Sequence, residues 1–186
     1  LSWLSSILKK NEGELISSLG SSQLKPGEVT FLPYLSGERT PHNNPNAQGV
    51  FFGLRHQHGA KELTQAVLEG VAFAFGDCQQ VLLDAGTEID EVSLIGGGSK
   101  SKLWAQILAS VLERPMIRYD SAEMGPALGA ARLAMLANNN GSLEEICQRP
   151  RVKEIIEPNL KHVPQYRKNR ERYQRLYRNL EEEFSE

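Results

Sequence analysis

The stretch V-S-L-I-G-G-G-S-K-S-K-L-W, residues 92–104, combines a short apolar run, three consecutive glycines and the start of an amphipathic pattern. The apolar run is typical of a buried parallel strand, and the glycines predict a turn into a helix. Backbone N–H groups at a helix start can receive a polar or anionic ligand, and glycines let a flat ring or a phosphate approach closely. The stretch therefore predicts either a ligand site or a tight strand-to-helix turn.

The glycine turn does not match the two common phosphate-binding motifs. A Walker loop needs Gly-Lys-Ser/Thr without interruption, whereas Ser99 separates Gly98 from Lys100. A G-x-G-x-x-G fingerprint that began at Gly96 would need a glycine where Ser101 stands. Spacing alone therefore leaves the ligand class open.

Helical and strand-like patterns alternate around this turn. Residues 60–85 predict a long helix, and residues 124–137 predict a helix rich in small side chains. Short apolar runs at 91–95 and 116–119 are strand candidates on either side of the helix that follows the glycines. The alternation predicts an α/β fold in which these last strands are parallel.

The sequence predicts further details of these helices. Gly129 inside the 124–137 helix costs about 1 kcal/mol relative to alanine, which predicts a backbone or a ligand too close for a methyl group. Ser99 or Ser101 is expected to cap the helix after the glycines. The 60–85 helix is expected to bury one apolar face, formed by Leu63, Val67, Val71, Ala74, Cys78 and Val81.

The composition is that of a soluble globular protein, with 40% hydrophobic residues, 24% charged residues and a net charge of −2. This charge gives no reason to expect binding to nucleic acid or to an acidic membrane. No apolar run approaches the roughly 18 residues that span a bilayer, and no secretory signal opens the sequence, so a cytoplasmic location is expected. Cys78 and Cys147 are expected to be buried free thiols.

Other polar clusters have two possible interpretations. Glu38, Arg39 and His42 lie in a loop rich in turn formers, which is either a plain surface loop or a functional one. A basic, partly aromatic segment follows residue 160 on a helix expected at 165–184, and a solvated helix face explains it better than an RNA-binding surface. His56 and His58 lack a third ligand, so no metal site is predicted.

Several long motifs together resemble the C-terminal part of the FGGY carbohydrate kinases, and most closely their xylulose kinase branch. G-V-F-F-G-L-R-H-Q-H-G-A-K-E-L-T-Q-A-V-L-E (49–69) is similar to the second signature of the family, and L-I-G-G-G-S-K-S-K-L-W-A-Q-I-L-A (94–109) to its adenosine motif. F-L-P-Y-L-S-G-E-R-T-P-H (31–42) and G-P-A-L-G-A-A-R-L-A (125–134) resemble the xylulose kinase branch. Gln48 and Ser101 depart from the pattern, because many members have Arg and several have Asn at these positions.

The resemblance implies an actin-like, ribonuclease H-like ATPase lobe of α/β class, with residues 1–186 as the incomplete C-terminal lobe, truncated at its N-terminal strands, and the N-terminal lobe absent. It implies ATP and Mg²⁺ as cofactors and a sugar as substrate, D-xylulose being converted to D-xylulose 5-phosphate. Related kinases for ribulose, gluconate or glycerol, or a non-catalytic actin-like interaction module, are the alternatives. A homodimer is possible.

For the site, the resemblance implies that Gly96, Gly97, Gly98, Ser99 and Ser101 hold adenine and ribose. The small-residue helix would pack beneath them. Glu38, Arg39 and His42 would lie near the cleft between the lobes, without an assigned chemical role. The catalytic base and the phosphate loops of the family correspond to segments outside this sequence, so the chain by itself is expected to be inactive.

Overall fold

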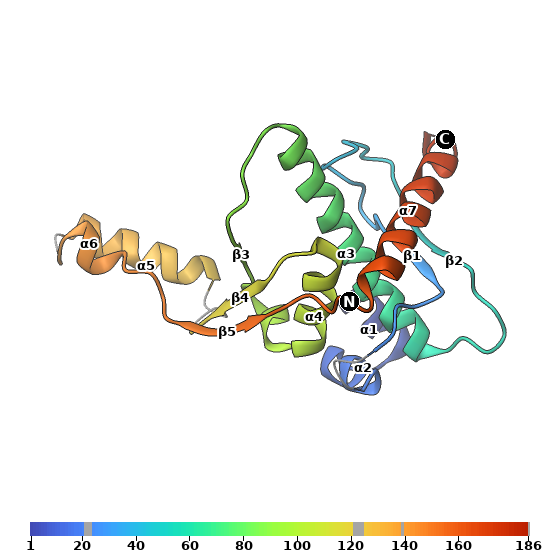
Figure 1. Cartoon of the computed structure of the whole chain (residues 1–186), viewed down its shortest axis with the longest axis horizontal. Coiled ribbons are helices and arrows are strands. Elements are labelled where there is room, and N and C mark those ends of the chain that lie inside the picture. Colours follow the sequence, from blue (N-terminus) through green and yellow to red (C-terminus); the bar gives the residue numbers. More distant parts are fainter. Residues whose placement is uncertain (21–23, 121–124, 139, 186) are drawn as a thin grey trace.

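The computed structural model describes residues 1–20, 24–120, 125–138 and 140–185, and Figure 1 shows the path of the chain. Helices and strands alternate through most of it, which confirms the predicted α/β class. The helices are α1 (Ser2–Leu8), α2 (Glu12–Ser18), α3 (Ala60–Asp84), α4 (Lys102–Leu112), α5 (Gly125–Ala137), α6 (Leu143–Ile146) and α7 (Val163–Leu180), with 3₁₀ turns η1 (Gly97–Lys100) and η3 (Glu182–Ser185). The strands are β1 (Thr30–Pro33), β2 (Gly49–Phe52), β3 (Val92–Ser93), β4 (Met116–Tyr119) and β5 (Val152–Ile156).

The strands form two small sheets. β1 pairs antiparallel with β2, and Pro33 lies at the end of β1, opposite Gly49. Because proline lacks an N–H donor, this position at a strand end suits it. In the second sheet β4 lies between β3 and β5. β3 runs parallel to β4, as predicted for the strands on either side of α4.

The antiparallel strand β5 was not predicted. Its sequence V-K-E-I-I carries two charged residues in the middle, which hid the strand pattern. In the fold, Glu154 forms salt bridges with Arg118 of β4 at 2.7 Å and with Lys102 of α4 at 2.8 Å. Contacts between distant segments therefore decide this strand.

Helix α3 is the centre of the fold and packs against β1, α2, α4 and α7 (Figure 1). Its bounds agree with the predicted helix, but the predicted apolar face is wrong. Val81 is 41% exposed, whereas the polar residues Gln65, Glu69 and Asp77 are buried. The buried face is rotated relative to the apolar pattern because residues far along the chain bind these polar side chains.

By length and composition alone, α3 would also qualify as a membrane-spanning helix, with a mean hydropathy of 1.3 over its most apolar window. However, 50% of that window is buried inside the fold. The core helix of a soluble protein has the same properties, so α3 is explained by its place in the core.

Helix α7 confirms the predicted C-terminal helix and packs along β1, α3 and α4. Tyr173 and Tyr177 are buried on its inner side. Its basic residues also make internal contacts. Arg170 donates to Asp77 Oδ1 at 2.9 Å, and Arg167 forms a salt bridge with Glu113. Part of the basic cluster therefore serves the fold itself.

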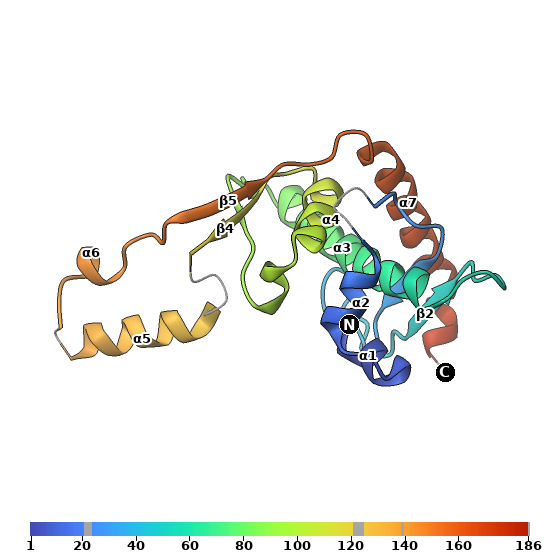
Figure 2. The same cartoon turned by 90° about the horizontal axis from the view of Figure 1, so that it is seen from below.

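Helices α5 and α6 project from the rest of the molecule as an arm, residues 125–146 without 139 (Figures 1 and 2). Along α5 the described side chains are all at least partly exposed, and a Cβ added at Gly129 would have nothing within 4 Å. No backbone among the described residues therefore lies close to Gly129, whereas the alternative, a ligand at this glycine, stays a prediction. Met124, the first residue of the predicted helix, lies outside the described residues.

The two cysteines differ from expectation. Both are free, as predicted, but Cys78 is only half-buried and Cys147 is exposed. Cys78 donates a hydrogen bond to the carbonyl oxygen of Thr40 at 3.2 Å. The prediction that both thiols are buried is wrong.

Candidate functional site

The glycine turn joins β3 to α4 through η1. Gly96 has φ 81° and ψ −172°, a backbone region that is essentially restricted to glycine. The Ser99 hydroxyl donates to the carbonyl oxygen of Gly96 at 2.6 Å and closes the turn. The Ser101 hydroxyl accepts from the backbone N–H of Trp104 at 3.1 Å. Ser101, and not Ser99, is therefore the N-cap of α4.

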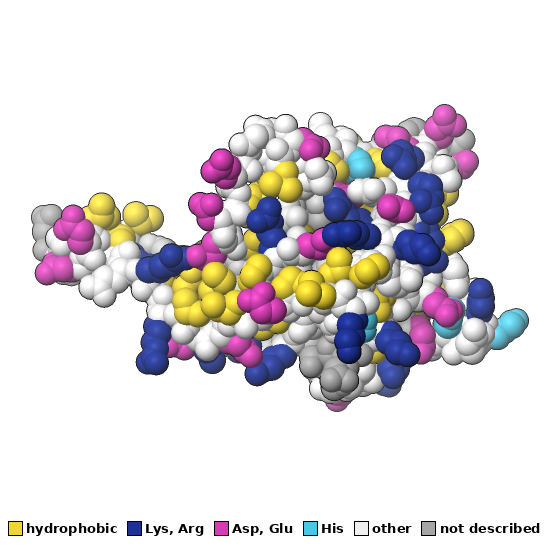
Figure 3. All heavy atoms as spheres, in the orientation of Figure 1, with side chains coloured by type: hydrophobic (Ala, Val, Ile, Leu, Met, Phe, Trp, Pro, Cys, Tyr) yellow, Lys and Arg dark blue, Asp and Glu magenta, His cyan; other side chains and the backbone are white. Residues whose placement is uncertain are grey.

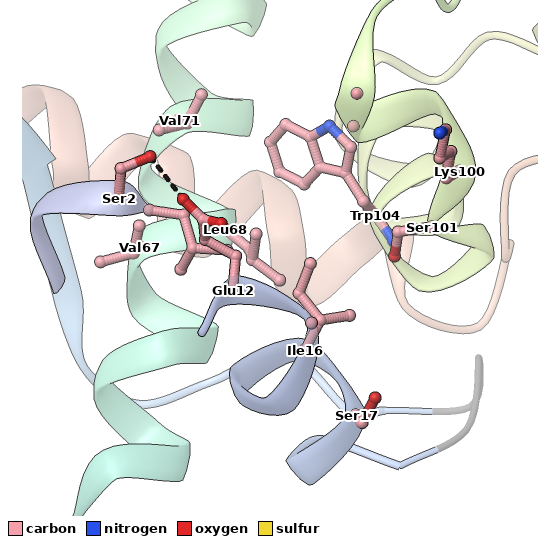
Figure 4. Close-up of a pocket in the computed structure, with 14 residues that line it drawn as sticks. Ser2, Glu12, Ile16, Ser17, Val67, Leu68, Val71, Lys100, Ser101 and Trp104 are labelled. Atoms are coloured by element: carbon pink, nitrogen blue, oxygen red, sulfur yellow. Dashed lines mark hydrogen bonds between the residues drawn. The ribbon is translucent and has the colours of Figure 1, made fainter. Parts of the chain in front are cut away.

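The turn borders a cavity of about 680 Å³, which we call the turn cavity (Figure 4). Its size is typical of sites for small molecules and cofactors. It lies between α2, α3 and the turn, next to the start of α1. The lining residues are Leu1, Ser2, Glu12, Gly13, Ile16, Ser17, Val67, Leu68, Val71, Gly97, Gly98, Lys100, Ser101 and Trp104.

The walls of the turn cavity are apolar in the middle and polar at the margins. The Trp104 indole projects from α4 toward α3, and Ile16 of α2 and Leu68 of α3 lie on the opposite walls (Figure 4). At one margin the Ser2 hydroxyl donates to Glu12 Oε1 at 2.6 Å. A flat heteroaromatic ring fits such a site, because its faces pack on apolar and aromatic walls while polar groups bind its edge.

Two glycines keep the turn side of the cavity free of side chains. A Cβ added at Gly97 would have nothing within 4 Å, so a side chain there would extend into open space. A Cβ added at Gly98 would lie 3.1 Å from two atoms of the Trp104 ring, which is too close without adjustment. Glycine at 98 thus lets the indole lie against the turn, and glycine at 97 leaves room for a ligand.

The structure divides the residues expected at the site into two groups. Gly97, Gly98 and Ser101 line the turn cavity. Gly96 and Ser99 lie outside the lining, where Gly96 supplies the left-handed backbone and Ser99 is buried with its hydroxyl bound to the turn. The small-residue helix α5 contributes no residue to this lining, so the expectation that it packs beneath the glycines is not met.

Most of the cavity wall was missed by sequence reasoning. Ser2, Glu12 and Ile16 come from α1 and α2, far from the glycines in sequence, and only the tertiary fold brings them to the turn. Trp104 was within reach of prediction, because it stands on the first turn of α4 beside the glycines. The Trp104 ring is only partly buried and borders the cavity.

The loop with Glu38, Arg39 and His42 folds against α7 and lies outside the lining of the turn cavity. Glu38 Oε2 accepts from the backbone N–H of His42 at 2.8 Å, and the His42 ring stacks on Tyr177 with 3.6 Å between ring centroids. Arg39 is exposed. Asn44 donates to the Tyr177 hydroxyl at 3.1 Å. The loop is therefore anchored to the core, and these contacts assign it no chemical role. In the described parts of the chain, no group of three His, Cys, Asp or Glu residues could hold a metal ion.

Comparisons with known proteins agree with this architecture. The family model of the FGGY carbohydrate kinases, C-terminal domain, matches residues 2–138. The xylulose kinase of Escherichia coli (strain K12) is 44% identical over 171 residues, which are 91% of this chain and 35% of that protein. The crystal structure of a xyloylose kinase from Brucella ovis matches with a TM-score of 0.86 and 42% identity over 97% of this chain and 38% of its own.

A gluconate kinase from Lactobacillus acidophilus is also similar, with a TM-score of 0.77 and 28% identity, over 96% of this chain and 37% of its own. Across these relatives the chain spans little more than a third of their length. The fold is that of the actin-like ATPases, as expected from the sequence. The chain belongs to the FGGY family of carbohydrate kinases, as part of their C-terminal domain.

Proposed function

We propose that the turn cavity holds the adenosine part of ATP in a kinase that phosphorylates a sugar. The observation that supports this most is the position of Gly97 and Gly98 at an apolar cavity that has Trp104 as an aromatic wall. Gly97, Gly98 and Ser101 would contact the nucleotide, whereas Gly96 and Ser99 would keep the turn in shape. ATP supplies the phosphoryl group in such kinases, and the family resemblance implies Mg²⁺ with it.

The sugar is proposed to be D-xylulose, converted to D-xylulose 5-phosphate. Several similar proteins are xylulose kinases, and residues 31–42 carry the motif of that branch. The similar gluconate kinase makes gluconate the first alternative, followed by ribulose and glycerol. A soluble cytoplasmic enzyme fits these relatives, and a homodimer is a further possibility.

Residues 1–186 are proposed to be an incomplete C-terminal lobe that needs the remainder of the kinase for catalysis. Because the chain spans 35% of the E. coli relative, most of such an enzyme lies outside it. Phosphoryl transfer depends on a positioned nucleophile and on neutralisation of the phosphate charge. The family resemblance implies that the catalytic base and the phosphate loops belong to segments outside this sequence. We therefore expect nucleotide binding without turnover.

A titration with a fluorescent adenine nucleotide tests the site. Wild type is expected to bind weakly, and Gly97→Val should abolish binding because the valine side chain would occupy the cavity beside the turn. Gly129→Val is the matched control, since Gly129 lies on the arm with open space around it. Equal binding by wild type and Gly97→Val would remove the turn from the nucleotide site.

A coupled enzyme assay tests whether residues 1–186 can phosphorylate a sugar without the rest of the kinase. The chain alone should give no product from ATP and xylulose, gluconate, ribulose or glycerol. Sustained turnover with any of these sugars would show that the catalytic groups lie within residues 1–186. In a kinase of full length that contains this chain, xylulose should be the preferred substrate, and preference for gluconate would overturn the sugar proposal.

A further inference from the structure

A second cavity lies on another part of the molecule and shares no lining residue with the turn cavity. We call it the α7 cavity, and its volume is about 770 Å³. It lies between the segment 25–28, the turn 52–55 and the N-terminal half of α7. The lining residues are Lys25, Pro26, Gly27, Glu28, Phe52, Gly53, Leu54, Arg55, His162, Gln165, Asn169 and Arg172.

The lining of the α7 cavity is strongly cationic. Lys25, Arg55 and Arg172 carry positive charge, against the single carboxylate of Glu28, and His162 adds an imidazole. Across the described ranges, none of these three cations forms a salt bridge. The lining therefore keeps an excess of positive charge, offset in part by Glu28 and by Glu69, whose carboxylate interacts with the charge of Arg172. An anion bound in the cavity would be attracted by this excess.

Arg172 is the innermost of these cations. A terminal nitrogen of its guanidinium donates to the carbonyl oxygen of Glu28 at 2.5 Å, and its Nε is buried without an acceptor. Because this Nε is shielded from solvent, an anion in the cavity would meet the terminal nitrogens of the guanidinium instead. The guanidinium presents its donors in a planar fork that matches the oxygens of a phosphate group.

The floor of the α7 cavity is held rigidly by α3 and α7. Glu69 accepts the backbone N–H of Gly27 at 2.9 Å, and Gln65 donates to the carbonyl oxygen of Lys25 at 2.6 Å. From α7, Asn169 donates to the carbonyl oxygen of Gly27 at 2.9 Å. With the Arg172 contact, side chains from two helices fix the backbone of residues 25–28. A site fixed in advance loses little entropy on binding.

We propose that the α7 cavity binds a small phosphorylated anion. Arg172 would grip one phosphate group through its guanidinium, while Arg55 and Lys25 at the margin would add attraction from the turn and from the segment before β1. The volume leaves room for more than a bare phosphate. The site is independent of the nucleotide proposal, because the two cavities share no residue.

The experiment is a calorimetric titration of the chain with inorganic pyrophosphate, without divalent metal and at low salt. Wild type should bind one equivalent. Arg172→Gln should weaken binding about tenfold or more, since a charge-assisted bidentate contact is lost. Arg175→Gln is the matched control, because Arg175 is an exposed cation on the same helix that lies outside the cavity lining. It should change the affinity less than twofold.

Two further variants keep the result interpretable. Arg172 also binds the carbonyl oxygen of Glu28, so its substitution affects the fold as well as the site. Arg55 is an exposed cation of the same lining, and Arg55→Gln is expected to weaken binding while it leaves the fold intact. Gly97→Val should bind pyrophosphate as wild type does, because it alters only the turn cavity. Lack of binding by wild type, or equal losses in Arg172→Gln and Arg175→Gln, would overturn the proposal. Loss of binding in Gly97→Val would assign the anion to the nucleotide site.

Discussion

Helices α3 and α5 both carry a glycine in mid-helix, yet the two glycines have opposite surroundings. A Cβ added at Gly70 of α3 would lie 2.2 Å from the carbonyl oxygen of Phe31 in β1, whereas one added at Gly129 of α5 would have nothing within 4 Å. α3 packs against β1, α2, α4 and α7, whereas α5 projects from the fold (Figure 1). A glycine in a helix therefore indicates close packing only where another element lies against it.

The largest effect is expected for Gly70→Ala. The new methyl group would overlap the backbone of β1, which has no flexible side chain to move aside, so α3 and β1 must separate. We expect a loss of about 4 kcal/mol in the free energy of unfolding, above the usual cost of overpacking, because the clash is with backbone. Urea unfolding followed by circular dichroism measures it. A loss below about 1 kcal/mol would show that α3 and β1 are not in close contact.

The burial of Glu69 on α3 disfavours its charged form, which predicts a pH dependence of stability. Burial raises the pKa of Glu69 to about 7, against the lowering effect of hydrogen bonds from Gln65 and Gly27 and of the Arg172 charge. The unfolded chain loses this proton near the ordinary value of 4.5, whereas the folded protein keeps it until about pH 7. The folded state therefore binds more protons across this interval, and its stability falls as the pH rises.

This decrease should amount to about 3 kcal/mol between pH 4.5 and pH 7. Urea unfolding of wild type and of Glu69→Gln across this range isolates it, because the other carboxylates are common to both proteins. The difference in stability between the two should shift in favour of Glu69→Gln as the pH rises, and then stay constant above pH 7. A difference that does not vary with pH would mean that Glu69 is ionised throughout.

Gly96 allows the effect of backbone conformation on stability to be measured apart from the effect of packing. Gly96 has φ 81° in the turn, and a Cβ there would have nothing within 4 Å. Gly96→Ala should therefore cost about 2 kcal/mol through backbone strain alone. Gly97→Ala is the matched control, because Gly97 has open space and no left-handed backbone, and it should change stability by less than about 0.5 kcal/mol. Equal losses would mean that the turn itself is packed against another segment.

Local patterns predicted the helices well and the packing poorly. The bounds of α3 and the N-cap of α4 at Ser101 follow from short-range rules, which a sequence displays directly. The buried face of α3 did not follow, because Glu69 and Asp77 are held in the core by Gly27 and Arg170, which are distant in sequence. Strand β5 was missed for the same reason.

Sequence motifs predicted only the part of the candidate site that lies in one continuous stretch of the chain. Gly97, Gly98 and Ser101 form the turn, and their proximity follows from the sequence. The opposite wall, with Glu12 and Ile16, depends on where α2 lies relative to the turn, and no local signal marks these residues. Motifs therefore located one side of the cavity, and tertiary structure supplied the other.

The smallest effect, and the one of opposite sign, is expected for Gly129→Ala. With no neighbour in the way, alanine removes the entropic cost of glycine in a helix and should stabilise α5 by up to about 1 kcal/mol. Hydrogen exchange of the α5 amides measures this locally, which matters because the arm has few contacts with the rest of the fold and can open by itself. Slower exchange in Gly129→Ala than in wild type is the expected result.

Faster exchange at all protein concentrations would mean that the glycine face of α5 packs within the chain. If exchange became faster only at high concentration, that face would instead pack against a second copy, and Gly129 would resemble Gly70 after all.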